Sequence, residues 1–277
     1  MTYSNQNWKP SGKDSKVNLI LDSGTEPDVL RLGAILLRFE SVSSTNDIAK
    51  RLARKGLPEG AVVLAKMQEQ GRGRRDRRWF SPLGGLWFSV VLRPGVPPSC
   101  ISLIPIAVGV STARTIRRLF RLDVVLKWPN DVMAGARKIA GILTESSAAV
   151  DDCYAIVGFG INANNSYASM PPQLRDETIS LSDLLRSRVN VDWLMQENLK
   201  EFAEVYAKIL ADDSADVVTE WKRLTDMLRQ PILVYEDEAF FQAIAVDLDS
   251  DGALLIQTED GTLRRLISAN ISLRRVK

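Results

Sequence analysis

Compact apolar runs, separated by polar stretches rich in glycine, dominate the first half of the chain. Their lengths and their aliphatic and aromatic content are typical of buried β-strands, and they lie at residues 34–39, 60–66, 85–92, 124–127, 136–145 and 154–161. Apolar positions recur at helical spacing after residue 45, up to a stop at Gly56, and again over 101–120. Strands thus follow one another before helices dominate, which predicts an α+β fold and not alternating βαβ units.

The second half of the chain changes from helical to strand patterning. Ser180 and Asp183 form a capping signal before one helix, and amphipathic spacing predicts two more helices over 191–210 and 217–228. From Pro231 onward, five short apolar runs alternate with the hairpin signals D-S-D-G and E-D-G-T. This pattern predicts a small antiparallel β-barrel of the SH3-like type.

These patterns divide the chain into three parts. Residues 1–30 are polar and interrupted by proline and glycine, which predicts a flexible extension with one short strand near 17–21. We expect a main domain over 31–228 and the small β domain over 229–277. The extension is too short and irregular for a winged helix-turn-helix, so we expect no N-terminal DNA-binding domain.

Composition restricts the setting in which the protein works. Of 277 residues, 45% are hydrophobic and 25% charged, as in ordinary soluble proteins, and the net charge of +2 disfavours a general nucleic-acid binder. Cys100 and Cys153 are the two cysteines and form no C-x-x-C pair, which fits a cytoplasmic protein without a disulfide framework. No secretion signal and no membrane-length apolar run is visible.

The chain has no histidine. A Ser-His-Asp or Cys-His nucleophile, an H-E-x-x-H metal site and imidazole acid–base chemistry are therefore excluded. Any catalysis must depend on positioning and on cationic side chains, or on Mg²⁺ held by oxygen ligands.

The most informative stretch joins the strands at 60–66 and 85–92. Five arginines lie between Arg72 and Arg78, with Gly71 and Gly73 beside the first of them. Glycines permit positive φ and close approach of a backbone to a ligand, and guanidinium groups bind phosphate or carboxylate through paired hydrogen bonds. The stretch predicts a loop that closes over a phosphorylated ligand; a solvated basic loop and a nucleic-acid patch are the alternatives.

Other segments carry weaker signals. In S-S-T-N-D (43–47), small polar side chains are equally suited to ligand contact and to capping a helix. K-W-P-N-D (127–131) ends a strand in a turn, and Lys138 taken alone resembles a surface lysine. Gly141 and Gly160 interrupt strands, which often marks the close approach of a ligand.

Five segments together resemble the biotin–protein ligase family, also called biotin–[acetyl-CoA-carboxylase] ligases. In the family's order and spacing they are S-S-T-N-D (43–47), the arginine stretch with its flanks (68–89), K-W-P-N-D (127–131), K-I-A-G-I-L-T-E (138–145) and G-F-G-I-N (158–162). The resemblance implies a class II synthetase-like catalytic domain, with a mixed sheet flanked by helices, followed by the SH3-like domain.

The resemblance also implies a reaction. In the family, ATP and biotin are substrates and Mg²⁺ is required. The biotin carboxylate attacks the α-phosphate to give biotinyl-5′-AMP, and a lysine amine of a biotin carboxyl carrier protein then displaces AMP. Homodimers are common among its members. Because no DNA-binding domain is expected here, the chain is similar to members that act as ligases without DNA binding.

Site residues follow from the match, position by position. The catalytic pair is Lys138 and Arg72. The biotin site comprises Ser44, Thr45, Asn46, Gln68, Arg72, Gly73, Arg74, Lys138 and Gly141. The ATP and phosphate site comprises Arg75, Arg77, Trp79, Lys127, Asn130, Asp131 and Asn162, and Asp131 is also the candidate metal ligand. Trp128 suits either a ligand wall or core packing.

One departure and two rival functions accompany this interpretation. Asp76 stands where members commonly have glycine, and its charge offsets part of the positive field of the loop. A lipoate–protein ligase or octanoyl transferase is expected to share the fold, but those enzymes lack K-W-P-N-D, and the transferases use a cysteine nucleophile. A nucleic-acid-binding protein would instead show steep salt dependence and indifference to biotin with ATP.

Overall fold

The computed structural model describes residues 18–21, 32–75, 77–94, 101–149, 152–165, 170–211, 213–236, 239–267 and 271–275. Most of the expected N-terminal extension, Asp76 and Cys100 lie outside these residues. The short strand expected near 17–21 is present as β1, Asn18–Leu21.

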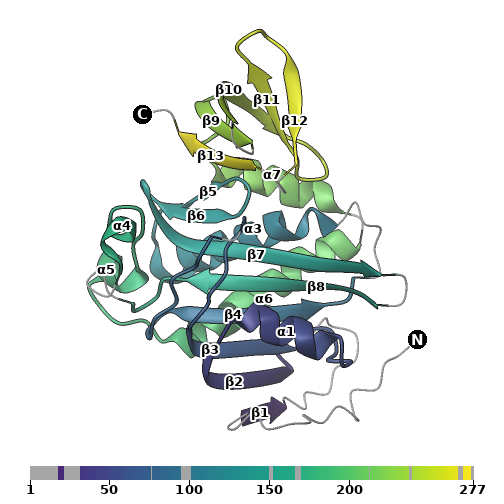
Figure 1. Cartoon of the computed structure of the whole chain (residues 1–277), viewed down its shortest axis with the longest axis vertical. Helices are drawn as coiled ribbons and strands as arrows, with labels where there is room; N and C mark the ends of the chain where they lie inside the picture. The colour runs from purple at the N-terminus through teal and green to yellow at the C-terminus, as the bar shows by residue number, and fades with distance from the viewer. Residues whose placement is uncertain are drawn as a thin grey trace.

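The main domain is built on an eight-stranded mixed sheet with the order β1-β2-β3-β4-β8-β7-β6-β5 (Figure 1). Strands β2 and β3 run parallel, and the other neighbours are antiparallel. The parallel pair is explained by the helix α1 between them, since parallel neighbours need a crossover connection. The strands after β1 are Ile35–Val42 (β2), Val62–Gln68 (β3), Leu86–Leu92 (β4), Val125–Lys127 (β5), Asp131–Ala134 (β6), Arg137–Ala149 (β7) and Asp152–Ile161 (β8).

Helices lie on both faces of this sheet. Figure 1 shows α3 and α6 behind the sheet, α1 in front, and α7 between the sheet and the C-terminal strands. The helices are Thr45–Ala53 (α1), Ile104–Phe120 (α3), Pro172–Arg175 (α4), Leu181–Leu185 (α5), Val191–Leu210 (α6) and Ser214–Leu224 (α7). The predicted capping box is confirmed at Ser180 and Asp183, whereas Ser44 at the start of α1 makes no side-chain cap bond. No helix among the described residues is long and apolar enough to cross a membrane.

Strand β8 shows how the sheet sets up two different faces. Ala155, Val157 and Phe159 point into the large core beneath α3 and α6. On the other face, Tyr154 and Ile156 pack into a smaller core with α1. Further along that face lie Gly158 and Gly160, which have no side chains of their own, so side chains from other elements lie directly against the sheet there. The face that carries α1 therefore changes from apolar packing to a floor of glycines.

The C-terminal domain is a five-stranded antiparallel sheet with the order β12-β11-β10-β9-β13. Its strands are Pro231–Glu236 (β9), Ala239–Leu248 (β10), Leu254–Thr258 (β11), Leu263–Leu266 (β12) and Ile271–Arg275 (β13). The α+β architecture with a separate small β domain is thus confirmed. Two elements escaped prediction: α4, and β6, whose first residue Asp131 was expected in a turn.

Candidate functional site

The floor of the site consists of glycines on the α1 face of β7 and β8. Gly141 in β7 pairs with Gly160 in β8. A methyl group at Gly160 would lie 2.5 Å from Trp79 Nε1, and one at Gly158 would lie 2.3 Å from Asn46 Oδ1. The glycines therefore admit side chains from α1 and from the arginine loop directly onto the sheet. The Trp79 side chain is what approaches Gly141 and Gly160 here, and the close approach of a ligand to them stays a prediction.

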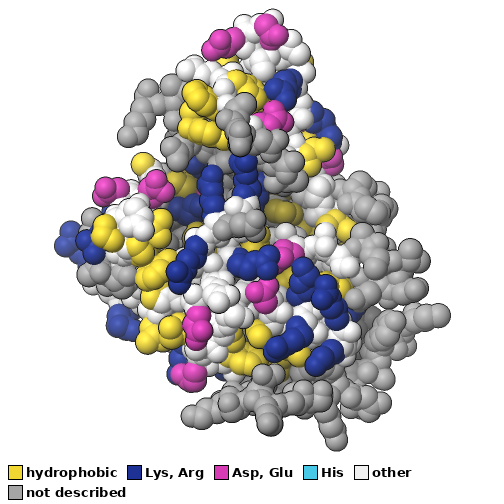
Figure 2. Space-filling view, viewed as in Figure 1, with side chains coloured by type: hydrophobic (Ala, Val, Ile, Leu, Met, Phe, Trp, Pro, Cys, Tyr) yellow, Lys and Arg dark blue, Asp and Glu magenta, His cyan; other side chains and the backbone are white. Residues whose placement is uncertain are grey.

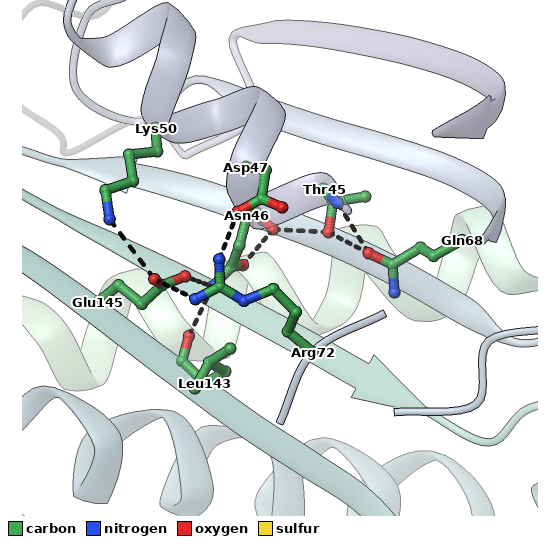
Figure 3. Close-up of polar contacts among 9 residues, drawn as sticks. Thr45, Asn46, Asp47, Lys50, Gln68, Arg72, Leu143 and Glu145 are labelled. Carbon is green, nitrogen blue, oxygen red and sulfur yellow. Dashed lines mark hydrogen bonds and ion pairs between the residues drawn. The ribbon is translucent and has the colours of Figure 1, made fainter. Parts of the chain in front are cut away.

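Neutral polar groups gather at one end of this floor, at the start of α1. Gln68 Oε1 accepts hydrogen bonds from the backbone N–H and the hydroxyl of Thr45, at 2.7 and 3.0 Å (Figure 3). Ser89 Oγ, fully buried in β4, lies 2.7 Å from Thr45 Oγ1 and 2.6 Å from Asn46 Oδ1. Gln68 Nε2 donates to Ser81 Oγ at 2.8 Å. We call Thr45, Asn46, Gln68, Ser81 and Ser89 the head end; it joins three of the expected biotin-binding residues into one network.

Charged groups gather at the other end of the floor, around β6 and the beginning of β7. Lys138 Nζ forms an ion pair with Asp131 Oδ2 at 2.8 Å and lies 5.5 Å from the centre of the Trp79 ring. Arg74 Nη1 donates to Asn130 Oδ1 at 3.5 Å. Asn130 is itself fixed, because its Nδ2 donates to the Ile142 carbonyl at 2.6 Å. We call Arg74, Asn130, Asp131 and Lys138 the charged end.

A β-bulge places Lys138 on the site face. Met133 pairs with Lys138 while Val132 pairs with Ala140, so Ile139 is an extra residue in β7. Ile139 and Ala140 are both buried in the main core, and Lys138 is turned to the face that carries Gly141. Without the bulge, strict alternation would put Lys138 on the side of Ala140, facing the core.

Burial affects the cations of the arginine loop unequally. Burial lowers the pKa of Arg74 to about 10; nearby Asp131 opposes this shift, and Arg75 and Arg77 add to it. Arg75 and Arg77 are exposed. Figure 2 shows Lys and Arg side chains gathered over the middle of this face, with a few carboxylates among them. A positive field around one half-buried guanidinium is an arrangement suited to binding an anion.

The backbone of the arginine loop forms a tight hairpin that extends β3 and β4. Trp79 N–H donates to the Gly71 carbonyl at 2.8 Å, and Gly73 N–H donates to the Arg77 carbonyl at 2.7 Å. The prediction that the glycines supply positive φ is wrong, because Arg75 has φ 56° and neither glycine does. Gly71 is needed for space, since a methyl group there would lie 2.3 Å from the Trp79 carbonyl oxygen. The N–H of Gly73 is used within the hairpin.

Arg72 and Trp79 leave this hairpin in different directions. Arg72 Nη1 pairs with Asp47 at 2.6 Å and Nη2 pairs with Glu145 at 2.8 Å, beside the head end (Figure 3). The indole of Trp79 covers Gly141 and Gly160. Its buried Nε1 has no hydrogen-bond partner among the described residues. An unsatisfied donor over the glycine floor marks a place where a ligand acceptor would be stabilised.

The remaining expected residues lie in different parts of the site and of the core. Lys127 lies opposite Asp131 in the β5–β6 pair. Asn162 is buried; its backbone N–H donates to the Ile139 carbonyl at 2.9 Å and its Nδ2 to the Lys138 carbonyl at 3.4 Å, so it holds the bulge. Trp128 packs in the core and donates from Nε1 to the Gly252 carbonyl at 3.0 Å, which attaches the C-terminal domain. Ser44 is buried beside Thr45.

Sequence reasoning missed Ser81, Ser89, Asp47 and Glu145. Ser89 carried a usable signal, because it is the single polar residue in the otherwise apolar run L-W-F-S-V-V-L. Glu145 ends the segment K-I-A-G-I-L-T-E and was given no role. Among the described residues, no group of three or more carboxylate, cysteine or histidine side chains is placed to hold a metal ion. Asp131, the candidate metal ligand, forms an ion pair with Lys138.

Two family models match this chain, one for each domain. The model of the Biotin/lipoate A/B protein ligase family matches residues 38–162, which include the whole glycine floor. The model of the Biotin protein ligase C terminal domain matches residues 232–274. The fold and site therefore define a member of the biotin and lipoate protein ligases with the C-terminal domain of biotin ligases.

Similar whole proteins narrow this class. The Bifunctional ligase/repressor BirA of Bacillus spizizenii is 30% identical over 87% of this chain and 75% of its own length. The Biotin--[acetyl-CoA-carboxylase] ligase of Paracoccus denitrificans is 30% identical over 82% of this chain and 95% of its own. The structure of the biotin protein ligase from Aquifex aeolicus in complex with biotin and ATP aligns with a TM-score of 0.77 and 28% identity, over 87% and 99% of the two chains. The chain belongs to the biotin protein ligase family.

Proposed function

We propose that this protein activates biotin with ATP to biotinyl-5′-AMP and then transfers the biotinyl group to one lysine of a biotin carboxyl carrier domain. The observation that carries this proposal is the division of one glycine floor into a neutral head end and a charged end. A biotin molecule has the same division, with a neutral ureido ring at one end and a carboxylate at the other.

The head end suits a cyclic urea. A ureido group offers two N–H donors and one carbonyl acceptor, and the hydroxyls and amides of Thr45, Asn46, Gln68 and Ser89 supply complementary neutral groups. A lipoyl ring has two sulfur atoms in place of the urea and gains little from such a network. We therefore assign biotin, and not lipoate, as the substrate, with Ser44 and Gly141 lining the same site.

The charged end suits the meeting of two anions. The biotin carboxylate and the α-phosphate repel each other, and cations between them lower that repulsion and stabilise charge on the phosphoryl oxygens. We assign Lys138 to bridge the carboxylate and the phosphate, and Arg74 to bind the phosphate beside it. Arg75, Arg77 and Lys127 extend the positive field toward the pyrophosphate, and Trp79, Asn130 and Asn162 complete the nucleotide site.

Arg72 and Gly73 order the loop over biotin. Arg72 pairs with Asp47 and Glu145 beside the head end. We therefore assign its contribution to catalysis, as the partner of Lys138, to its position in the loop that covers biotin. A closed loop excludes water and so protects the mixed anhydride from hydrolysis. In the transfer step the lysine amine attacks the acyl carbon, AMP leaves with the anhydride oxygen, and the amine loses one proton.

A Mg²⁺ ion fits this donor set. Mg²⁺ usually keeps several waters and binds one or two carboxylates together with substrate phosphates, so the single carboxylate of Asp131 next to Asn130 is sufficient from the protein. When bound, the ion would neutralise phosphate charge. We further propose the domain division 31–228 and 229–277, and a cytoplasmic setting in keeping with two isolated cysteines.

The test is ATP–pyrophosphate exchange, followed by transfer to a carrier domain. Biotin should drive exchange in the wild type, lipoate should not, and mass spectrometry should find one biotinylated lysine on the carrier. If lipoate drives exchange equally well, the substrate is wrong. If neither acid drives exchange, the proposed activity is wrong.

A further inference from the structure

One carboxylate beside the head end has no part in the function proposed above. Glu145 lies in β7, seven residues beyond Lys138, and at about 3.3 Å per residue this separation is roughly 20 Å. It is therefore distant from the place where the carboxylate and the phosphate react. Its side chain is only 16% exposed and points to the start of α1 (Figure 3).

Both oxygens of this carboxylate are used, and by different elements. Oε2 accepts a hydrogen bond from Asn46 Nδ2 of α1 at 3.0 Å. Oε1 accepts from Arg72 Nη2 of the arginine loop at 2.8 Å and lies 3.6 Å from Lys50 Nζ of α1. Glu145 is thus a shared partner of the head end and of the loop that covers it.

The bond to Asn46 sets the direction of that amide. Asn46 Nδ2 also approaches the Leu143 carbonyl at 3.3 Å, so two acceptors hold its NH₂ group toward β7. Its Oδ1 must then point to the Ser89 hydroxyl, which donates to it at 2.6 Å. An amide that is turned over would bring its NH₂ to the hydroxyl and its oxygen to a carboxylate, which is unfavourable.

The bond to Arg72 is one half of a two-carboxylate clamp. Arg72 Nη1 pairs with Asp47, whose side chain is 38% exposed, and Nη2 pairs with the more buried Glu145. Exposed ion pairs contribute little to stability, whereas a charge-assisted bond to a mostly buried carboxylate contributes more. Glu145 is therefore the stronger of the two tethers on the loop.

We propose that Glu145 is a positioning residue that fixes the Asn46 amide in its ligand-binding direction and, through Arg72, aligns the arginine loop with the head end. It touches neither the reacting carboxylate nor the phosphate. The inference rests on the proposed function, because Asn46 contacts biotin only if biotin is the substrate.

The experiment measures biotin affinity by calorimetry without ATP, and the KM values for biotin and ATP in pyrophosphate exchange. Glu145→Ala should weaken biotin binding about tenfold and raise the biotin KM equally, with the ATP KM unchanged within about twofold. Glu145→Gln keeps an acceptor for Asn46 and should lose only about threefold. Asp47→Asn disturbs Arg72 but not Asn46 and should lose about twofold. Glu40→Gln, which changes an exposed carboxylate in β2, should leave all values unchanged.

A double-mutant cycle separates positioning from general damage. If Glu145 acts through Asn46, Glu145→Ala should change biotin affinity less than about twofold in an Asn46→Ala background. Additive losses, an unchanged affinity in Glu145→Ala, or an equal rise of both KM values with a lower melting temperature would each overturn the inference. If Glu145→Ala does not fold, the inference is tested by Glu145→Gln: a threefold loss of biotin affinity supports it, and an unchanged affinity overturns it. A wild type that neither binds biotin nor exchanges pyrophosphate would overturn the proposed function, and the inference with it.

Discussion

The two ends of the glycine floor hold their polar groups in place by different interactions. At the head end the groups are neutral and, apart from the half-buried Gln68, buried, and they hydrogen-bond to one another across α1, β3 and β4. At the charged end, Lys138 pairs with Asp131 and Arg74 contacts Asn130, with Lys138 30% exposed. The head end is thus held together by hydrogen bonds between neutral groups, whereas the charged end is held by the Lys138–Asp131 ion pair and the Arg74–Asn130 hydrogen bond.

This difference predicts different responses to perturbation. A neutral network costs little to bury when each group has a partner, so it can be rigid before biotin arrives. A buried cation is costly, and its attraction to a protein carboxylate must be exchanged for attraction to the substrate anions. We expect changes at the head end to act on biotin binding, and changes at the charged end to act on the chemical step and on stability.

The largest effect is expected from Lys138→Ala. Because Lys138 is the cation assigned between the two anions, its loss should reduce kcat for biotin-dependent pyrophosphate exchange by about 10²–10³-fold. Lys66→Ala is the matched control; Lys66 is 64% exposed and paired with Glu40, and its loss should change the rate less than about twofold. A weakened biotin affinity with unchanged kcat would show that Lys138 acts on biotin binding and not on the chemical step.

Gly158→Ala should act on the head end alone. The added methyl group would lie 2.3 Å from Asn46 Oδ1 and would push that amide off the floor. Overpacking of this kind costs about 1–3 kcal/mol, so we expect biotin affinity, measured by calorimetry, to fall by about 5- to 150-fold. In Gly109→Ala, the new methyl group meets Leu126 Cδ2 at an ordinary 3.5 Å, and binding should not change. Unaltered affinity in Gly158→Ala would show that Asn46 is not held against the sheet.

Arg74→Met should separate function from stability at the charged end. Burial lowers the pKa of Arg74 to about 10, below its usual 12.5, so the folded state disfavours the charged form. That cost is fully present below pH 10 and is relieved as the pH rises through 10 toward 12.5. We expect Arg74→Met to raise the free energy of unfolding at pH 7 by about 1 kcal/mol while abolishing most exchange activity.

Urea denaturation at pH 7 and near pH 10.5 checks both parts of this prediction. The difference in unfolding free energy between Arg74→Met and the wild type should be smaller at the higher pH. The reason is that the cost of keeping Arg74 charged in the folded wild type is then partly relieved. Arg77→Met is the control. Because Arg77 is exposed, this substitution should change the free energy of unfolding by no more than about 0.5 kcal/mol. A destabilised Arg74→Met would mean that the cation already has full compensation in the ligand-free protein.

The smallest effect is expected from Trp128→Phe. The smaller phenyl ring keeps only part of the core packing, and the hydrogen bond from Nε1 to the Gly252 carbonyl is lost; the loss of this bond alone should cost about 1 kcal/mol of unfolding free energy. Since Trp128 precedes Asn130 and Asp131, the ATP KM should rise about twofold while biotin affinity stays constant. Trp193→Phe, at a position 42% exposed, is the control. A change in biotin affinity would show that the two ends are not independent.

Local patterns predicted most strands and helices because their signals are contained in short stretches. The apolar run of β4, the capping box at Ser180 and the hairpin turns before β11 and β12 each depend on neighbouring residues. Strand β6 was missed because it is short and follows Pro129, where a turn is the usual outcome. The positive φ was assigned to glycines by their general preference, but the hairpin places it at Arg75.

By itself the sequence narrowed the kind of chemistry: without histidine, catalysis by positioning and cationic side chains, or by Mg²⁺ held by oxygen ligands, remained. It also determined the family, through five segments in one order. The tertiary structure alone decided which groups meet. The bulge at Ile139 turns Lys138 to the site face, and the pairing of β7 with β8 puts Glu145, Asn46 and Arg72 together from three separate segments. Such contacts depend on strand register and on long-range packing, which no short stretch of sequence encodes.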